Sequence, residues 1–324
     1  MVVKLIALFG LISSFLVGVL ADNEIVEDYK VKELPSSYAH LGEGPHWDIA
    51  TQNLYMVDLD VGKLKRLDYN QKKWYKCQIE NATFATFIIP VEGTTDKFAV
   101  GIERQVAIVK WDGVSETCKV EKIILTVEQS YNNNRFNDAK CDPLGRLFAG
   151  TMRKSDFDLR TGHLFKLLKP NSYEVMLSNL GIANGLVWNE KGDKFYFVDS
   201  QDYNVKQYDY NTKTGEISNA IVISNTTSLP DGMTIDNKGF LYVAGNGGSA
   251  VLKIDPKKRK IVQKIEIPAK EITSCAFGGP NLDILFVTTA NEKYPSSNAG
   301  KTYMVTGLGA RGLPMTKLNL KHYN

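Results

Sequence analysis

Short runs in which apolar and polar residues alternate recur along most of the chain, separated by clusters of turn-forming residues. Residues 54–59, 194–198 and 240–244 are such runs, and 191–193 (Lys-Gly-Asp) is such a turn cluster. A period of two is typical of strands that bury one face. Beyond the N-terminal segment, no long stretch has helical periodicity. The pattern therefore predicts an all-β chain.

Six segments of the chain share one template, in which a polar or small residue enters an apolar strand and an Asp, Asn or Gly turn follows. The second residues of these segments are 44, 50, 47, 47 and 43 positions apart. Repeats of about 40–50 residues with four strands each are the signature of a β-propeller. We therefore predict a single six-bladed β-propeller domain over residues 22–324. The segments are GEGPHWD from Gly42, TFIIPVE from Thr86, FNDAKCD from Phe136, ANGLVWN from Ala183, PDGMTID from Pro230 and TSCAFGG from Thr273.

A further strand, at residues 27–34, precedes the first repeat, and the last repeat completes its blade around residues 301–308. Propellers remove exposed strand edges when a strand from one terminus pairs into the blade made by the other. We expect this closure here.

The N-terminus has the pattern of a secretory signal. Lys4 precedes sixteen uncharged residues, and Val19-Leu20-Ala21 suits cleavage after Ala21. A membrane anchor is the alternative, but the run is shorter than the about 20 apolar residues that a span needs. We predict a signal peptide at residues 1–21, and a secreted protein without membrane attachment once it is removed.

Secretion changes the interpretation of two other features. Asn81 and Asn225 head N-glycosylation sequons, which the secretory pathway makes usable. The four cysteines would meet an oxidising compartment, and three pairings are available if all are bridged. Buried free thiols are the alternative. The cysteines are Cys77, Cys118, Cys141 and Cys275.

Composition and charge exclude several classes of partner. With 43% hydrophobic and 23% charged residues the chain is globular, and 39 Lys plus Arg against 36 Asp plus Glu leave a net charge of only +3. So small a charge gives no strong field to attract nucleic acid or anionic lipid. We expect a monomer with a small-molecule substrate.

The first strand of each propeller blade runs beside the central channel, so equivalent positions of the repeats form a ring. Four of the six ring residues carry a carboxylate or an amide, and converging carboxylates repel one another unless a partner is present. An all-oxygen set favours a hard divalent cation, Ca²⁺ first, with Mg²⁺ and Mn²⁺ as alternatives. The lack of His or Cys argues against a typical zinc site, and Zn²⁺ is kept as a further alternative. Turn formation and strand capping are the other reading of these residues. The ring holds Glu43, Phe87, Asn137, Asn184, Asp231 and Ser274.

Other catalytic signals are weak. There is no GxSxG elbow, and the four histidines show no HxxxH spacing. Arg135, two residues before Asn137, would place a fixed cation at the same end of the channel, where it suits an oxygen-rich ligand. A surface salt bridge is the alternative role for this arginine. The inventory favours metal-assisted hydrolysis.

Several longer motifs resemble the family of regucalcin (senescence marker protein), gluconolactonases and luciferin-regenerating enzyme. They span residues 41–312, and the segments FIIP, WDGVS and FGGPNLD are more similar to the insect luciferin-regenerating branch. The resemblance implies a six-bladed propeller with one divalent cation in the channel, and lactone hydrolysis. The motifs are GEGPHWD, NNRFNDAKCDPLGRLFAGTM, NGLVW, LPDGMTID, TSCAFGGPNLD and VTGLGARG.

The resemblance also assigns roles. It implies metal ligation by Glu43, Asn184 and Asp231, and proton transfer by Asp231. Arg135 and Asn137 become substrate contacts, which moves Asn137 out of the ligand set. One position departs from the family: Ser155 stands where regucalcins have a substrate-contacting Glu, which leaves the substrate open.

The combined expectation is a secreted, metal-dependent hydrolase of the lactonase type, with Asp231 as proton donor and acceptor. A related hydrolase acting on another small molecule, such as a nitrile- or thiazole-type compound, an aromatic lactone or an organophosphate, is one alternative. A non-enzymatic, calcium-binding secreted propeller is the other.

Overall fold

The computed structural model describes residues 29–323, so the signal peptide predicted for residues 1–21 lies outside the described part. Within it the chain is all-β, as predicted, with 24 strands. Three short 3₁₀ segments interrupt them: η1 (Leu59–Val61), η2 (Ser200–Asp202) and η3 (Leu320–Tyr323). None of the described helices has the length and apolar character needed to cross a bilayer.

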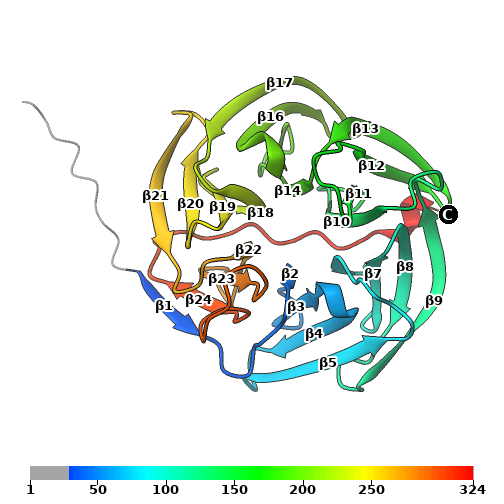
Figure 1. Cartoon of the computed structure of the whole chain (residues 1–324), viewed down its shortest axis with the longest axis horizontal. Helices are drawn as coiled ribbons and strands as arrows, with labels where there is room; N and C mark the ends of the chain where they lie inside the picture. The colour runs from blue at the N-terminus through cyan, green and yellow to red at the C-terminus, as the bar shows by residue number, and fades with distance from the viewer. Residues whose placement is uncertain (1–28, 324) are drawn as a thin grey trace, which may run out of the picture.

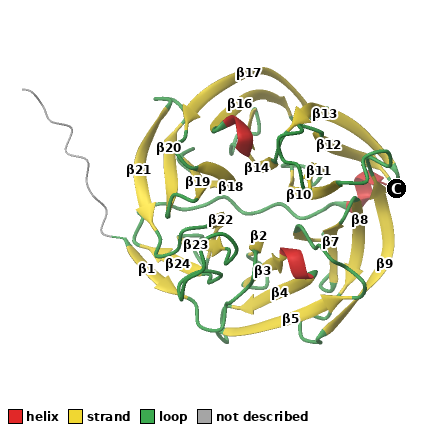
Figure 2. Cartoon of the chain, viewed as in Figure 1, coloured by secondary structure: helices red, strands yellow, loops and turns green. Residues whose placement is uncertain are grey.

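Four separate four-stranded antiparallel sheets and one eight-stranded sheet surround a common centre, which gives a propeller-like fold (Figures 1 and 2). Three of the four-stranded sheets follow chain order. They are β10 (Asn134–Cys141), β11 (Leu147–Arg153), β12 (Gly162–Lys169) and β13 (Ser172–Leu180); β14 (Ala183–Trp188), β15 (Lys194–Asp199), β16 (Asn204–Asn211) and β17 (Glu216–Asn225); and β18 (Leu229–Ile235), β19 (Leu241–Asn246), β20 (Ala250–Asp255) and β21 (Lys260–Glu266).

The fourth four-stranded sheet joins the two ends of the chain. β1 (Lys30–Glu33) pairs antiparallel with β24 (Tyr303–Thr306), which continues through β23 (Ile284–Thr289) to β22 (Ile272–Gly278). Val31 lies opposite Val305 in this pairing. The closure predicted from the sequence is therefore confirmed, and the outer edge of β24 is covered.

The eight-stranded sheet consists of two antiparallel arrays joined at their outer strands. β5 and β9 pair in parallel through Gln78 with Thr117 and Ile79 with Cys118, and a disulfide links Cys77 to Cys118 at this seam. The prediction of six separate blades is thus correct only in part, because this pairing merges two arrays. The arrays are β2 (Gly42–Asp48), β3 (Asn53–Asp58), β4 (Lys63–Asp68) and β5 (Lys73–Ile79), and β6 (Ile88–Pro90), β7 (Lys97–Ile102), β8 (Gln105–Lys110) and β9 (Thr117–Thr126).

The six repeated segments coincide with the strands that begin each array. They correspond to β2, β6, β10, β14, β18 and β22, and Figure 1 shows β2, β10, β14, β18 and β22 nearest the centre. Apolar side chains of neighbouring sheets pack between them, as where Val198 and Val205 meet Met233 and Val243. The sheets therefore bury both faces of their inner strands, and β3 and β23 are buried at every position.

A C-terminal strap, residues 307–323, crosses the molecule after the last strand (red in Figure 1). Its backbone hydrogen-bonds several sheets in turn: Gly312 N–H donates to Leu282, and Leu318 N–H to Pro90. Tyr323 is buried at its end, where the hydroxyl accepts from Leu147 N–H at 2.7 Å. The strap therefore ties together sheets that are distant in sequence.

Candidate metal and substrate site

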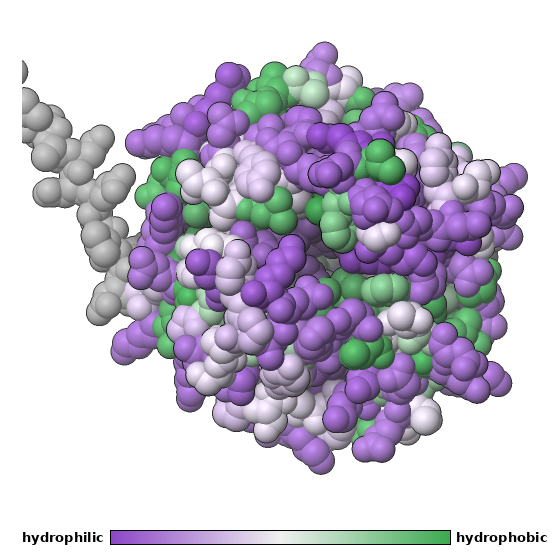
Figure 3. Space-filling view, viewed as in Figure 1, coloured by the Kyte–Doolittle hydropathy of each residue, from purple (hydrophilic) through white to green (hydrophobic). Residues whose placement is uncertain are grey.

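The structure brings all five predicted site residues to one cavity of about 1070 Å³ at the centre of the molecule. The cavity lies on the face that carries η1 and η2, whose residues Leu59, Asp60, Ser200 and Gln201 contribute to its wall. Figure 3 shows this face hollowed at its centre and surrounded mainly by hydrophilic side chains. The predicted residues that line it are Glu43, Arg135, Asn137, Asn184 and Asp231.

Each of the four inner strands that carry these side chains has an irregularity in its pairing. The register of β2 against β3 shifts between Glu43 and His46, and β10 shifts against β11 between Phe136 and Ala139. β14 and β18 shift at the equivalent places, next to Asn184 and Asp231. Such bulges bend a strand and redirect its side chains, and they are enriched near active sites. In each of these strands a bulge thus directs the side chain beside it toward the cavity.

A glycine follows each proposed metal ligand, and close backbone approach explains two of the three. A Cβ on Gly185 would lie 2.6 Å from the Asp231 carbonyl oxygen, and one on Gly232 would lie 2.0 Å from Ser274 Oγ. Neighbouring inner strands therefore approach so closely at this depth that only glycine fits.

Hydrogen bonds fix two of the proposed ligands and leave one oxygen of each without a partner. Asn184 Nδ2 donates to Ser200 Oγ at 3.1 Å, and Asn246 Nδ2 donates to Asp231 Oδ2 at 3.1 Å. The remaining oxygens, Asn184 Oδ1 and Asp231 Oδ1, are buried and lack a hydrogen-bond partner among the described residues. Leaving such atoms unpaired costs about 1–3 kcal/mol each, so a cation bound by both oxygens would remove this cost.

The two proposed substrate contacts are joined to each other. Arg135 donates to Asn137 Oδ1 at 2.8 Å and to the Phe136 carbonyl at 2.9 Å, while Asn137 Nδ2 donates to the Ala183 carbonyl at 3.0 Å. Both side chains are buried. Burial lowers the pKa of Arg135 to about 10, although the nearby carboxylates oppose this shift. The guanidinium therefore stays charged at neutral pH and is held in one orientation.

The carboxyl groups in the channel are electrostatically strained. Burial, followed by the charges of Asp231 and Asp138, raises the pKa of Glu43 well above its ordinary value. Burial also raises the pKa of Asp231 to about 7, despite its hydrogen bond from Asn246. Arg135 offsets only part of this. Two carboxyl groups and an amide oxygen with spare lone pairs fit a hard divalent cation, which would relieve the strain.

The family model of the SMP-30/Gluconolactonase/LRE-like region matches residues 41–291. The chain belongs to this family. Regucalcin of Bos taurus is 32% identical over 288 residues, which are 85% of this chain and 93% of the bovine protein. Regucalcin of Gallus gallus is 32% identical over 301 residues, covering 88% and 97% of the two chains.

Solved structures agree with this family assignment. A luciferin-regenerating enzyme superposes with a TM-score of 0.84 at 38% identity, over 90% of this chain and all of that one. A regucalcin from Agrobacterium tumefaciens, described as a calcium-binding protein, superposes with a TM-score of 0.80 at 20% identity, over 90% and 98% of the two chains. At that identity the second structure supports the fold alone.

The loop after β11 contributes to the cavity differently from the family pattern. Ser155 is exposed and is not part of the cavity wall; its hydroxyl accepts a hydrogen bond from Asn133 at 2.8 Å. Phe157 of the same loop lines the cavity instead. Further aromatic wall residues come from separate loops, and because these residues share no motif they could not be predicted from the sequence. They are Phe84, Tyr203 and Tyr294.

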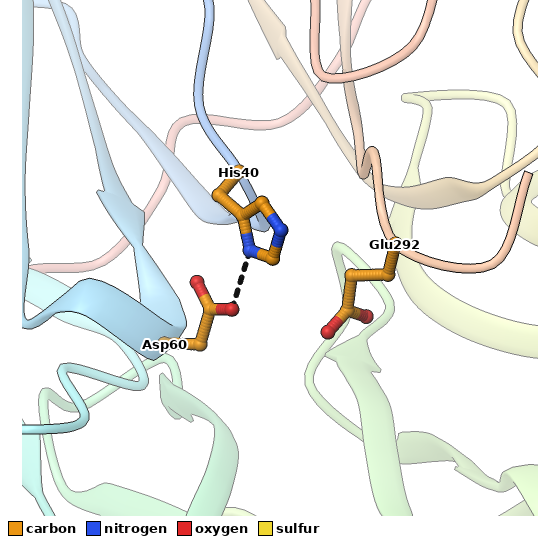
Figure 4. A group of neighbouring side chains, drawn as sticks. All are labelled: His40, Asp60 and Glu292. Atoms are coloured by element: carbon orange, nitrogen blue, oxygen red, sulfur yellow. Dashed lines mark hydrogen bonds and ion pairs between the residues drawn. The ribbon is translucent and has the colours of Figure 1, made fainter. Parts of the chain in front are cut away.

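A second group of possible ligands, also missed in the sequence, lies at the rim of this cavity (Figure 4). His40 Nδ1 and Asp60 Oδ2 are 2.5 Å apart, and Glu292 approaches from the opposite side. Burial lowers the pKa of His40, but the hydrogen bond and charge of Asp60 outweigh it, so the net shift is upward. Burial and the charge of Asp60 raise the pKa of Glu292. The carboxyl groups of Asp60 and Glu292 therefore add negative charge to the cavity wall, and protonation of His40 offsets part of it.

Proposed function

We propose that this chain is a secreted, divalent-metal-dependent hydrolase of the lactonase type. The observation that carries the proposal is the pair of buried, unpartnered oxygens on Asn184 and Asp231, in a cavity shared with Arg135 and Asn137. Family membership supports the same reaction class, since the family name includes gluconolactonase. We also propose to count the eight-stranded sheet as two blades, because each half has the strand order of the separate sheets. The protein is then a six-bladed, single-domain propeller over residues 22–324.

Glu43, Asn184 and Asp231 would hold the cation through their oxygens. Ca²⁺ is the first choice for such donors, and Mg²⁺, Mn²⁺ or Zn²⁺ are the alternatives. When bound, a cation of this kind supplies Lewis-acid polarisation of a carbonyl oxygen.

The chain's own groups account for binding and proton transfer. Arg135 and Asn137 are fixed by their mutual hydrogen bond and would orient the substrate oxygens. Asp231 would accept a proton from the water whose oxygen attacks the lactone carbonyl carbon. As the ring C–O bond breaks, the same proton passes from Asp231 to the departing alkoxide oxygen. The product is one hydroxy acid, and Asp231 returns to its starting state.

The direct test compares lactone hydrolysis by the wild type, Asp231→Asn and a matched control, Asp283→Asn. Asp283 is an exposed carboxylate in the turn between β22 and β23. We expect Asp231→Asn to lower kcat/KM by at least about 100-fold, the scale of a lost acid–base group, and the control to match the wild type. Equal activity of all three proteins would contradict the assignment.

Two other functions each have a specific observation in their favour. The aromatic wall of Phe84, Phe157, Tyr203 and Tyr294, together with 38% identity to a luciferin-regenerating enzyme, favours hydrolysis of a larger aromatic compound. A non-enzymatic calcium-binding role is favoured by the oxygen donors of Glu43, Asn184 and Asp231, which suit Ca²⁺ whether or not a substrate is turned over, and by the 32% identity to regucalcin of Bos taurus. A panel of sugar lactones, aromatic lactones, organophosphates and thiazole-type nitriles separates the three, because the last function predicts calcium binding without turnover.

We also propose that the protein is secreted and that it is a monomer. Asn81 and Asn225 are both exposed, so both sequons are accessible to glycosylation. The Cys77–Cys118 disulfide is of a kind that persists in oxidising compartments. A drop in apparent mass after treatment of the secreted protein with a peptide N-glycosidase is the expected result.

A further inference from the structure

A second cavity, of about 270 Å³, lies at the opposite end of the same inner strands. β2, β10, β14 and β18 each line the first cavity near their start and the second cavity three to five residues later. At about 3.3 Å per strand residue, these positions are separated by at least about 10 Å. The pairs are Glu43 and His46, Arg135 and Lys140, Asn184 and Trp188, and Asp231 and Thr234.

The C-terminal strap forms the outer wall of this second cavity through residues 313–316. Two contacts to β2 hold that part of the strap: Lys317 Nζ lies 2.8 Å from Asp48 Oδ2, and Trp47 N–H donates to Met315 Sδ at 3.2 Å. The wall is therefore a fixed part of the fold, and it brings Leu313 and Met315 against the strand ends.

Two buried nitrogen groups on the wall of this cavity lack hydrogen-bond partners among the described residues. They are Trp188 Nε1 and His46 Nε2, on side chains that are 6% and 3% exposed. Burial lowers the pKa of His46 to about 3, so its ring is neutral under physiological conditions. A buried donor without an acceptor is costly, and an indole N–H can only donate. Both nitrogens have almost no accessible surface, and the Trp188 ring packs against Phe148, Phe195 and Tyr210, so neither nitrogen faces the open part of the cavity.

Lys140 adds a cationic group to the same wall. Its Nζ donates to the Met233 carbonyl, which uses one of the three N–H bonds of an ammonium group. Burial lowers its pKa, while the charge of Asp138 opposes that shift. Glu190 also lines the cavity but is exposed, so solvent screens its charge. The remaining wall is largely apolar, with Val187, Ile235, Leu313 and Met315.

We propose that this second cavity is a binding site for a small apolar carboxylic acid, separate from the proposed hydrolytic site. The apolar wall would hold the body of the acid, and the Lys140 ammonium group, which keeps N–H bonds beyond the one it donates to the Met233 carbonyl, would bind its carboxylate. The small volume limits the ligand to about the size of a single substituted ring or a short acyl chain. The two cavities then give the channel one ligand site at each end.

The test is a calorimetric titration of the intact protein with benzoate, with benzylamine as the cationic counterpart of the same size. Lys140→Met keeps the length of the side chain and removes its charge. Leu313→Trp fills the cavity from the half-exposed strap. Arg135→Met serves as the control, because it removes a cation from the other cavity only. Thermal denaturation of each variant establishes that it is folded.

We expect one benzoate per wild-type chain, no benzylamine binding, at least a tenfold loss of benzoate affinity in Lys140→Met and no binding in Leu313→Trp. Arg135→Met should bind as the wild type does. No saturable benzoate binding by the wild type would overturn the proposal. Binding that survives in both Lys140→Met and Leu313→Trp, or that disappears in Arg135→Met, would also overturn it, because the acid would then occupy the other cavity. These outcomes do not depend on catalysis, so they stand apart from the test of the lactonase.

Discussion

At the scale of single residues, the proposed site consists of polar side chains whose burial is unfavourable in the folded protein. Glu43 and Asp231 are both shifted toward the neutral form by burial, and Asn184 has a buried oxygen without a partner. The inner strands could be packed with apolar residues instead, as Phe87 is at the equivalent position. Retention of these polar groups together is therefore best explained by a ligand that they share.

In protein freed of metal by a chelator, the raised pKa of Asp231 should make the folding stability depend on pH. Its pKa of about 7 lies above the ordinary value of 3.8, so between these values the folded state binds a proton that the unfolded state has lost. The free energy of unfolding should fall by up to a few kcal/mol as the pH rises from 4 to 7. Urea denaturation at pH 5 and pH 8 measures this fall, and Asp231→Asn should reduce it. Identical pH dependence in both proteins would exclude this origin.

The sequence predicts these residues because they occupy one position of a repeat, which places them at one depth of the channel. The rim residues His40, Asp60 and Glu292 belong to no repeated position and meet only after the chain has folded. The same holds for the second cavity, where the strap supplies Leu313 and Met315 from far along the chain. Alternation and repeat spacing carry no signal for such contacts.

At the scale of elements, the seam between β5 and β9 is the main departure from independent blades. Cys77 and Cys118 lie on these outer strands, 41 residues apart in sequence. The cysteine pairing could not be predicted from the sequence, because it depends on which outer strands become neighbours in the folded protein. Cys141 and Cys275 are buried free thiols, so one pair is bridged and two thiols stay free.

Removal of this disulfide should destabilise the protein. The chain-entropy model gives about 4 kcal/mol for a loop of this length. We expect Cys77→Ser/Cys118→Ser to lower the free energy of unfolding by about 2–4 kcal/mol in urea titrations. A reducing agent should lower the free energy of unfolding of the wild type to that of the double variant, and it should not change the free energy of unfolding of the double variant. Insensitivity of the wild type to complete reduction would contradict a stabilising role for the seam.

The strap offers a second prediction at this scale. The Tyr323 hydroxyl is the acceptor for the buried Leu147 N–H. Tyr323→Phe leaves that N–H without a partner while it keeps the ring, so we expect a loss of about 1–3 kcal/mol in stability. Tyr173→Phe is the matched control, since Tyr173 is 39% exposed. Equal urea midpoints for the two variants would show that the end of the strap contributes little.

At the scale of the whole molecule, closure by β1 decides whether the fold has a free strand edge. A chain that begins at Leu34 lacks β1 and exposes β24, whereas one that begins at Asp22 keeps the pairing. The shortened chain should melt at a lower temperature and self-associate through the exposed edge. Calorimetry and light scattering measure both effects. Unchanged melting and a monodisperse monomer would show that closure is dispensable.

We propose that the channel at the centre of the molecule is a cation-dependent reaction site. The most direct measurement is the rate of lactone hydrolysis by chelated wild-type protein as Ca²⁺ is added back, with Asp231→Asn beside it. We expect a negligible rate without the cation, saturable recovery in the wild type and no recovery in Asp231→Asn. A full rate in the chelated wild type, or equal recovery in the variant, would contradict the account.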